Sequence, residues 1–491
     1  MQEKYIKLIF GLKLKQIRTA KSLSLFGLSK LSGLSKSYLN EIEKGKKYPK
    51  PDKIAILAEK LEIPYDQMVS LKLDKNLAPI GEILQSNILK EIPLDLFGIQ
   101  ESTLIDIISN APAKFNAFIS TIIEIAQNYN FSRENFYLAS VRSFQEANNN
   151  YFDDLEQGVL KFSKLYQLDL SKKIFSGELE EILTEEYEYT IDDRELGKYS
   201  TLENLRSVFV PKTKTLLLAP QIDEAQRTFI YAKELAYNFL NFEERLYTFS
   251  FIEFQNFDQV LNNFFASYFA GALVIPKTSI TQQLGDLFRQ STFDSKAFLN
   301  IIGRFNASPE SVYQRFTNIL PKDFNIQNLF YLRLTHKAGS EKYQLKKELH
   351  LSHQHSPHAN EANEHYCRRW VSLNVLQEIG KREKEHVFDV QISHYPGDDL
   401  KYLVLSSATK DPFQDDHYRS ISVGLMIDKN LQRKIGFLGD PEIKNQEVGV
   451  TCERCTIADC RVRQVPAVII ERQSKNNQIA SVVNKLVEKF S

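Results

Sequence analysis

Residues 28–63 read LSKLSGLSKSYLNEIEKGKKYPKPDKIAILAEKLEI and decide the fold of the first part of the chain. Apolar residues recur in this stretch at the three- and four-residue spacing of amphipathic helices, and Ser, Gly or Pro separates one group from the next. We therefore predict a small all-α domain with helices around residues 12–18, 24–31, 36–43 and 52–61.

The residues between these helices have the chemistry that helix ends require. Gly33 lies in a short Ser-Gly-Leu turn, and the Ser35 side chain can accept a backbone N–H at the start of the helix over 36–43. Gly45 follows that helix, where a left-handed backbone is needed. The helices over 24–31 and 36–43 are thus predicted to meet at a tight turn.

This pattern resembles the lambda-repressor-like, or XRE, helix-turn-helix family. The resemblance rests on Gly33, on Ser35-x-x-Tyr38-Leu39 and on Glu43-x-Gly45. It implies that the helix over 36–43 enters the major groove of a double-stranded DNA operator. We predict base contacts from Lys36, Ser37, Asn40 and Glu41, and phosphate contacts from Lys44, Lys46, Lys47 and Tyr48.

The charge distribution agrees with DNA binding by this domain, residues 1–75. The 491 residues carry 62 Lys and Arg against 62 Asp and Glu, which excludes a uniformly basic coat and an acidic tail. Residues 1–75 alone hold 16 basic and 8 acidic residues. This excess argues against the alternative, a helical protein–protein module with a solvated lysine face. Leu25 replaces the polar residue with which the family usually contacts phosphate, so that contact is expected to be weaker.

Length and hydropathy predict a multidomain cytoplasmic protein. At about 150 residues per domain, the chain should hold roughly three domains. No apolar run approaches the ~20 residues of a membrane span. The first residues, MQEKYIKLIFGLKLKQ, are too rich in lysine for a signal peptide. We expect no membrane partner.

Residues 76–185 are predicted to form a helical connector. Leu, Ile, Phe and Asn recur there at helical spacing without a catalytic motif. We expect this segment to supply packing and dimer contacts.

Residues 186–322 are predicted to form an α+β domain, with strands over 187–191 and 208–218. The helical stretches RTFIYAKELAYNFLNF and NNFFASYFAGALVIP resemble the ImmA/IrrE-type zinc peptidase family. In that family an HExxH helix supplies two His ligands and a Glu base, and a later helix supplies a Glu ligand. Here the HExxH positions read Lys233-Glu234-Leu235-Ala236-Tyr237, and we place the later position at Phe265. We therefore predict a zincin-like domain without metal ligands and without peptidase activity.

Residues 323–491 are predicted to form a second α+β domain, of the PAS or GAF kind, which usually binds a small molecule against its sheet. A helix is expected over 370–379, and strands over 329–336, 342–350, 387–396, 401–409 and 420–428.

The four cysteines of the chain, Cys367, Cys452, Cys455 and Cys460, all lie in this last domain. Disulfides are rare in a reducing cytosol, so gathered thiols predict a metal site. The Cys-x2-Cys-x4-Cys spacing fits either tetrahedral zinc or an iron–sulfur cluster. Unrelated thiols, with Cys367 merely buried, are the alternative. The histidines at 350, 353, 355, 358 and 365 are another ligand source, although a polar loop explains them as well.

The order of these parts resembles the short-chain fatty acyl transcriptional regulators of bacteria. The match is carried by EANNNYFDDLE (146–156), ASYFAGALVIP (266–276) and CERCTIADCRVRQVP (452–466). The resemblance implies a regulator of propionate, methylcitrate or glyoxylate genes that senses acyl-CoA or CoA. It also implies a [4Fe–4S] cluster on the four cysteines. Arg461 and Arg463 follow the motif and could either bind a CoA phosphate or stabilise the loop.

We expect a homodimer, because one helix-turn-helix reads only a short half-site and symmetric pairing doubles the contacts. Two rival functions remain open. One is a redox- or metal-responsive regulator with a structural Zn2+ site. The other is a regulatory metallopeptidase, against which residues 233, 237 and 265 speak.

Overall fold

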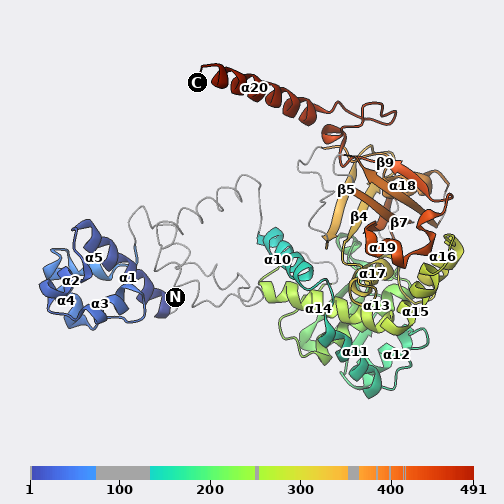
Figure 1. Ribbon diagram of the computed structural model, residues 1–491. Helices are drawn as coiled ribbons and strands as arrows, with labels where there is room; N and C mark the ends of the chain where they lie inside the picture. Colours follow the sequence, from blue (N-terminus) through green and yellow to red (C-terminus); the bar gives the residue numbers. More distant parts are fainter. Residues whose placement is uncertain are drawn as a thin grey trace. The chain divides into compact units, whose positions relative to one another are not determined.

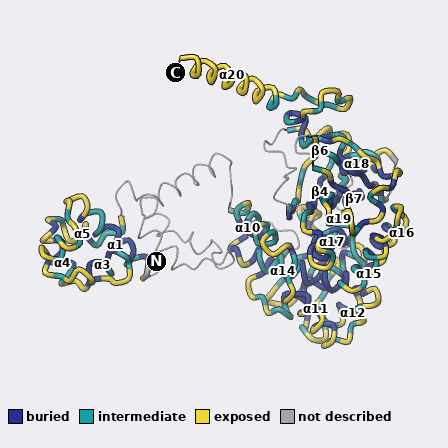
Figure 2. The backbone as a smooth tube through the Cα atoms, viewed as in Figure 1, coloured by how far each residue is buried: buried dark blue, intermediate teal, exposed yellow. Residues whose placement is uncertain are grey.

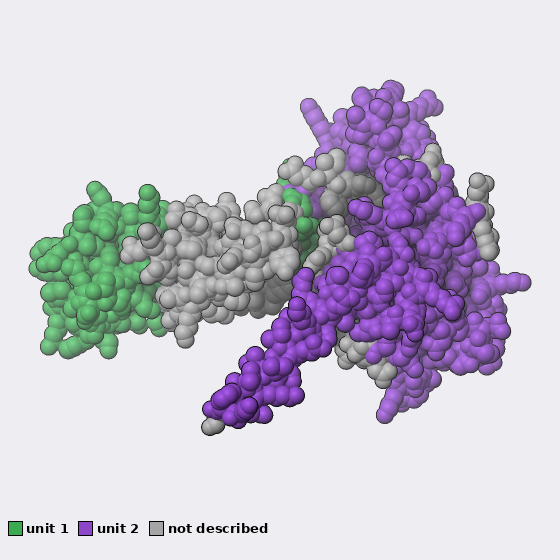
Figure 3. All heavy atoms as spheres, turned by 90° about the horizontal axis from the view of Figure 1, so that it is seen from above, with its two compact units in different colours: residues 1–140, 255–257 green, residues 141–254, 258–491 purple. Residues whose placement is uncertain are grey.

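The computed structural model describes residues 3–72, 133–248, 254–351, 364–382, 385–396, 400–412, 414 and 416–490. The chain divides into two compact units, residues 1–140 with 255–257 and residues 141–254 with 258–491 (Figure 3). Most of the predicted connector, residues 76–132, lies outside the described residues. The predicted histidines 353, 355 and 358 lie outside them as well.

The first unit contains the predicted all-α domain. Its helices are α1 (Glu3–Ala20), α2 (Leu25–Ser32), α3 (Lys36–Glu43), α4 (Pro51–Lys60) and α5 (Tyr65–Val69) (Figure 1). Phe10, Leu14, Leu28, Leu39 and Ile42 lie in its buried core. The predicted helices are confirmed, and the first is longer than expected because its apolar face continues back to the start of the chain.

The turns on either side of α3 have the predicted chemistry. Ser35 accepts a hydrogen bond from the Tyr38 backbone N–H at 3.2 Å. Gly33 and Gly45 have left-handed φ angles of 70° and 68°. A β-carbon at Gly45 would lie 2.9 Å from Leu8 Cα, so this position also requires glycine for close packing on α1.

The second unit begins with a helical layer and a small sheet. Its helices are α10 (Arg133–Ala147, which begins in the first unit), α11 (Asp153–Leu165), α12 (Ser176–Glu185), α13 (Glu224–Phe239), α14 (Phe257–Val274), α15 (Lys277–Phe288), α16 (Ser295–Gly303) and α17 (Pro309–Asp323). The sheet contains β1 (Thr190–Asp192), β2 (Ser207–Val210) and β3 (Thr215–Leu218) in the order β1-β3-β2.

Two features of this layer bear on the sequence-based expectations. Leu155 and Phe162 of α11 and Leu179 of α12 belong to the same buried core as α13 and α14. The last part of the predicted connector therefore packs with the peptidase-like region. The predicted strand over 208–218 is a pair of antiparallel strands, β2 and β3, because the chain turns at Lys214 with a φ of 49°.

The rest of the second unit is a six-stranded sheet in the order β5-β4-β8-β7-β6-β9. Its strands are β4 (Leu329–Lys337), β5 (Tyr343–His350), β6 (His386–Tyr395), β7 (Leu400–Lys410), β8 (His417–Met426) and β9 (Lys444–Glu447). The pairs from β4 to β8 are antiparallel, and β9 joins β6 in parallel. The five predicted strands are confirmed.

Helices cover both faces of this sheet (Figure 1). Leu332 and Val404 pack with α18 (Val371–Arg382) on one face. Tyr331 and Ile421, on the other face, share a core with α17. A boundary between residues 322 and 323 therefore runs through one continuous core, since α17 belongs to the peptidase-like region and β4 to the sheet region.

Two further helices complete the second unit. Helix α19 (Lys429–Lys434) follows β8, and α20 (Val468–Phe490) follows the cysteine motif. No residue of α20 is buried (Figure 2). Within the described part of the chain, no helix combines the length and hydropathy needed to cross a membrane.

Candidate functional site

Helix α3 has an exposed side that carries the predicted base-reading residues. Lys36 and Ser37 are exposed, and Asn40 and Glu41 are half-exposed, whereas Leu39 is fully buried. The helical repeat thus separates a solvent side from a core side, as insertion into a groove requires.

The predicted phosphate-contacting lysines lie at and after the end of α3, half-exposed at Lys44 and exposed at Lys46 and Lys47. Lys47 Nζ forms an ion pair with Glu41 at 2.8 Å. The Tyr48 ring meets the Phe10 ring edge to face, with centroids 5.0 Å apart. Lys47 and Tyr48 therefore also stabilise the free domain.

A buried ion pair that the sequence analysis missed fixes α3 to α1. Arg18 Nε and Nη2 donate to the two Glu43 oxygens at 2.5 and 2.8 Å, and Arg18 Nη1 donates to the Leu23 carbonyl at 2.7 Å. Because the pair is bidentate, it sets the orientation of α3 as well as its position. The sequence did carry a signal of this ion pair, because Glu43 falls on the apolar side of the helix, where a charged residue needs a partner.

The former metal-ligand positions of the peptidase-like region hold a different polar group. Lys233 Nζ and the Tyr237 hydroxyl, one turn apart on α13, both donate to Asn263 Oδ1 of α14, at 2.6 and 3.3 Å. Phe265, near which we placed the third position, does not join this group, whereas Asn263 faces α13. Two residues along a helix turn the side chain to nearly the opposite face, and the Phe265 ring lies 6.2 Å from Phe242.

Glu234, the surviving residue of the peptidase motif, is neutralised. Arg245 Nη2 donates to both of its oxygens at 2.7 and 2.6 Å, and the Tyr189 hydroxyl donates to it at 3.1 Å. Both side chains of the ion pair are only 8% exposed. Across the described residues, no group of three or more His, Cys, Asp or Glu side chains is arranged to hold a metal.

Burial lowers the pKa of Lys233 to about 7. The Glu234 charge opposes this shift, and the charges of Arg245, Arg206 and Lys347 add to it. The position that holds an imidazole ligand in the peptidase family thus holds a poorly solvated ammonium here, and other cations lie within electrostatic range of it.

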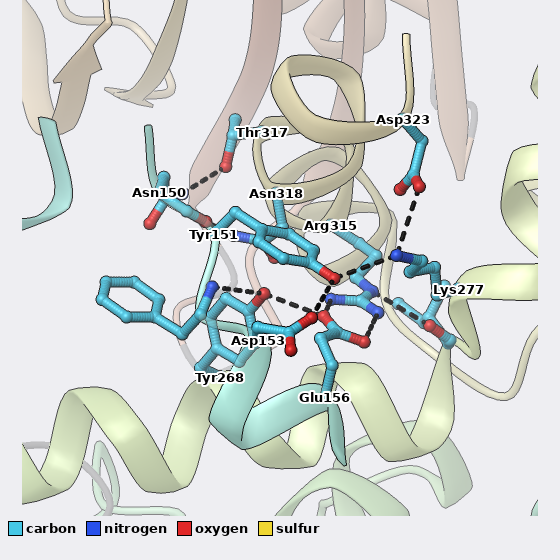
Figure 4. Close-up of polar contacts among 12 residues, drawn as sticks. Asn150, Tyr151, Asp153, Glu156, Tyr268, Lys277, Arg315, Thr317, Asn318 and Asp323 are labelled. Carbon is cyan, nitrogen blue, oxygen red and sulfur yellow. Dashed lines mark hydrogen bonds and ion pairs between the residues drawn. The ribbon is translucent and has the colours of Figure 1, made fainter. Parts of the chain in front are cut away.

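The segment 146–156, on which the family resemblance rests, forms a buried polar network (Figure 4). Arg315 Nη1 and Nη2 donate to the Glu156 carboxylate at 2.6 and 2.8 Å, and Arg315 Nε donates to the Ile275 carbonyl at 3.1 Å. The Tyr268 hydroxyl donates to Glu156 at 2.8 Å. Burial opposes the ionisation of Glu156, but the hydrogen bonds and charge of Arg315 outweigh it and lower the pKa of the carboxyl.

The same network continues to the asparagine of the segment. Asn150 Nδ2 donates to Thr317 Oγ1 at 2.7 Å, and Asn318 Nδ2 donates to the Asn150 carbonyl at 2.8 Å. Lys277 Nζ donates to the Tyr151 hydroxyl at 2.9 Å (Figure 4). These bonds join the turn before α11 to α17, so the segment has a structural role in this chain.

Two of the four thiols meet around Gly449. The Gly449 backbone N–H donates to Cys367 Sγ at 3.3 Å. A β-carbon at Gly449 would lie 2.8 Å from Cys455 Sγ, which is too close for any other residue. Trp370 Nε1 donates to the Gly449 carbonyl at 2.8 Å and fixes this glycine in place.

Cys452 belongs to the same group. Burial raises the pKa of the Cys367 thiol, and the charges of Cys455 and Cys452 raise it further. Cys452 N–H donates to the His365 carbonyl at 2.8 Å, which joins the motif to the segment before Cys367. Cys460 lies further along the loop and is partly exposed.

Arg463 stabilises the cysteine loop, which is one of the two roles expected for it. It donates to the Cys452, Cys455 and Ile457 carbonyls at 3.0, 3.3 and 2.5 Å, and so closes the loop on itself. Arg461 is exposed. Of the predicted histidines, His365 bonds Glu453 at 2.8 Å and His350 bonds Glu348 at 3.3 Å.

Comparisons with known proteins agree with this geometry. Residues 14–68 match the family model described as helix-turn-helix, and residues 195–317 match the IrrE N-terminal-like domain. The match identifies residues 14–68 as a helix-turn-helix, a motif whose second helix reads the major groove of DNA. No curated protein matches the chain.

Two solved structures are similar to parts of the chain. A Mycobacterium tuberculosis transcriptional regulator is 18% identical, with a TM-score of 0.47, over 66% of this chain and 92% of its own. The restriction-modification controller protein C.AhdI from Aeromonas hydrophila is 37% identical, with a TM-score of 0.13, over 13% of this chain and 94% of its own.

The Lys233→Met variant should remove a pH-dependent penalty on stability. The pKa of Lys233 lies near 7 in the folded chain and near its ordinary value, about 10.5, when unfolded. The cost of burying the charge is present in full below about pH 7 and falls as the pH rises. Between about pH 6 and pH 9, the wild type should therefore gain roughly 2–3 kcal/mol relative to Lys233→Met. Urea denaturation followed by Trp370 fluorescence measures this, and exposed Lys172→Met should show no such trend.

Loss of the Glu156 carboxylate should destabilise the second unit strongly. Glu156→Gln leaves the Arg315 charge buried and unneutralised, which should lower the free energy of unfolding by about 3–5 kcal/mol. The double variant Glu156→Leu/Arg315→Met should recover much of this, because no uncompensated charge remains. The same fluorescence experiment, with the exposed pair variant Glu188→Gln as control, checks the result. Equal stability of Glu156→Gln and the control would contradict it.

Proposed function

We propose that this chain is a cytoplasmic bacterial transcription regulator. In this proposal its helix-turn-helix reads a double-stranded DNA operator, and its C-terminal region senses short-chain acyl-CoA or CoA. The regulated genes would then belong to propionate, methylcitrate or glyoxylate metabolism. The observation that carries the proposal is the presence, in one chain, of a helix-turn-helix and of a sheet domain in which Cys367 and Cys455 meet at Gly449.

The sheet region supports a sensor of the PAS or GAF kind. Strands β4 to β8 are antiparallel, with the first and last of them side by side in the middle of the sheet. Helix α18 covers one face and α17 the other. A face held between a sheet and helices of another subregion is a common place for a small-molecule site.

A [4Fe–4S] cluster held by Cys367, Cys452, Cys455 and Cys460 is part of the proposal. The Cys455 and Cys452 thiols lie within electrostatic range of Cys367, and burial raises the pKa of the Cys367 thiol. Thiolates held close together repel one another, and a metal cation would compensate their negative charge. Such a cluster would supply one-electron redox chemistry or fix the loop that carries it. A structural zinc ion on the same thiols is the alternative and would make the protein a redox- or metal-responsive regulator.

The exposed face of α20 supports a homodimer. Ile479, Val483, Leu486 and Phe490 follow one another at spacings of four, three and four residues, and all but Val483 are at least half exposed, with Val483 at 49%. This spacing is typical of the apolar seam of a short coiled coil, with β-branched Ile479 and Val483 followed by Leu486 and Phe490. A second copy of α20 is the partner that such a seam fits.

Base and phosphate contacts should separate in DNA-binding measurements. Asn40→Ala should weaken binding to the operator by roughly 5- to 100-fold and relax base preference at one position, because a bidentate amide contact is lost. Lys46→Ala should weaken binding to all sequences and reduce the salt slope by about one. Fluorescence anisotropy at several salt concentrations measures both effects. Lys60→Ala, an equal charge loss at the end of α4, should leave binding unchanged.

The absorption spectrum distinguishes the metal alternatives. Protein purified without oxygen should absorb broadly near ~400 nm, and Cys455→Ser should abolish this band because a ligand is lost. Thr456→Ala, on the same loop, should retain it. Colourless protein with bound zinc would establish the alternative site. A gel shift that no short acyl-CoA or CoA alters would contradict the sensing role.

A further inference from the structure

Three cations lie together on the α17 face of the large sheet. Lys347 of β5 is directly opposite Arg333 of β4. Ile421 of β8 is opposite Arg333 on the other side, and Arg419 lies two residues before Ile421. Residues two apart on a strand point to the same face, so Arg333, Lys347 and Arg419 share one face across three adjacent strands.

Glu310 in the first turn of α17 lies among these cations. Arg333 Nη1 approaches its carboxylate at 3.0 Å and Arg419 Nη1 at 3.8 Å. Gln314 Nε2 donates to it at 3.1 Å. Burial opposes the ionisation of Glu310. The positive charges of Arg333, Lys347, Arg419 and Arg206 outweigh this effect and lower the pKa of Glu310 to about 2. Arg206 precedes β2, so the peptidase-like region supplies the fourth cation.

Positive charge exceeds negative charge in this group. Asp411 acts on Arg206 and Arg333 as a second carboxylate, so four cations face two anions. The Lys233 ammonium, which is only 5% exposed, lies within range of Arg206 and Lys347. The Lys347 side chain is exposed, so the group is open to solvent on that side. Like charges held close together repel, and a bound anion would relieve that repulsion.

A second observation points to a ligand at the same place. Arg333 Nε is buried and has no hydrogen-bond acceptor among the described residues. Buried guanidinium donors are normally satisfied, and one that is not calls for a bound group. The Arg419 side chain is only 11% exposed and is also directed at Glu310.

We propose that Arg333, Lys347 and Arg419, which share one face of the large sheet, form a binding site for the phosphate groups of a small molecule. Guanidinium groups match phosphate oxygens in pairs, and the N-terminus of α17 adds favourable backbone N–H dipoles. A group with two or more negative charges matches the excess charge. The site lies on the face of the sheet that α17 covers, so a ligand there would connect β4, β5 and β8 with the start of α17.

This site deepens the proposed sensing function and rests on it only for the source of the phosphate. The same chemistry is carried by CoA and by free pyrophosphate. Calorimetry on the full chain at low ionic strength separates them, with CoA, inorganic pyrophosphate and phosphate-free pantetheine as probes. Wild type should bind CoA and pyrophosphate, and pantetheine far more weakly.

Two variants should change the affinity for the phosphate probes in opposite directions. Arg333→Gln should weaken binding of both phosphate probes by roughly 10- to 100-fold, because a charge-assisted bond is lost. Glu310→Gln should strengthen it several-fold, because an internal competitor is removed, and a misfolded variant would not do so. Arg142→Gln is the matched control; Arg142 pairs with Glu348 at 2.7 Å, and its loss should change affinity less than twofold.

Each remaining outcome has a definite meaning. If CoA binds wild type and both site variants equally, the phosphate site is overturned while the sensing role stands. If pyrophosphate shows the expected pattern and CoA does not bind, the site stands and CoA sensing fails. Absence of binding by both phosphate probes overturns the site.

Discussion

The buried ion pair between Glu156 and Arg315 holds the second unit together. It joins the start of α11 to the middle of α17, two helices that are far apart in the sequence. Desolvation of the two charges is expensive, and the bidentate geometry with the Tyr268 hydroxyl offsets it only while all partners are present. Helix α17 in turn lies against the large sheet, where Tyr313 and Ser407 share a hydrogen bond at 3.0 Å. The position of Glu310, at the N-terminal end of α17, therefore depends on this ion pair.

The peptidase-like region illustrates what happens when metal ligands are replaced by charged residues. The Glu234 carboxylate has received a guanidinium, Arg245, and the ligand positions have received an ammonium and a phenol that share one amide oxygen. In the zinc peptidase family, a zinc ion concentrates two positive charges at one point of such a site. Here positive charge is spread over side chains, an arrangement that suits holding an anion.

Alternation and helix-end chemistry predicted most of the fold. The strand predicted over 329–336 is Leu329–Lys337, and the helix over 36–43 has the predicted bounds, because these patterns are local. The packing of α11 and α12 on α13 and α14 could not be predicted, because an amphipathic pattern does not show which helix it will meet. The register of α14 could not be predicted either, because a motif with no surviving ligand does not show which residue faces α13. Both features concern which helix faces meet, and local patterns do not show this.

The candidate sites divide in the same way. The thiols and the DNA-facing residues of α3 could be chosen from sequence because their members are close together or share an unusual chemistry. The cationic group could not, because Arg206, Lys233, Arg333, Lys347 and Arg419 come from five separate elements. Arginine and lysine are also the ordinary residues of solvated surfaces. Only the sheet register and the packing of α17 bring them to one place.

Gly449 has a consequence for how this protein tolerates change. It lies between the sulfurs of Cys367 and Cys455, and its carbonyl is bonded by Trp370. Even the methyl group of alanine would push one sulfur away from the other. In a saturation mutagenesis screen, residue 449 should thus share the phenotype of the cysteines, although it has no side chain and binds nothing itself. A strict requirement for glycine at residue 449 would report on the distance between the two sulfurs more directly than replacement of the cysteines does.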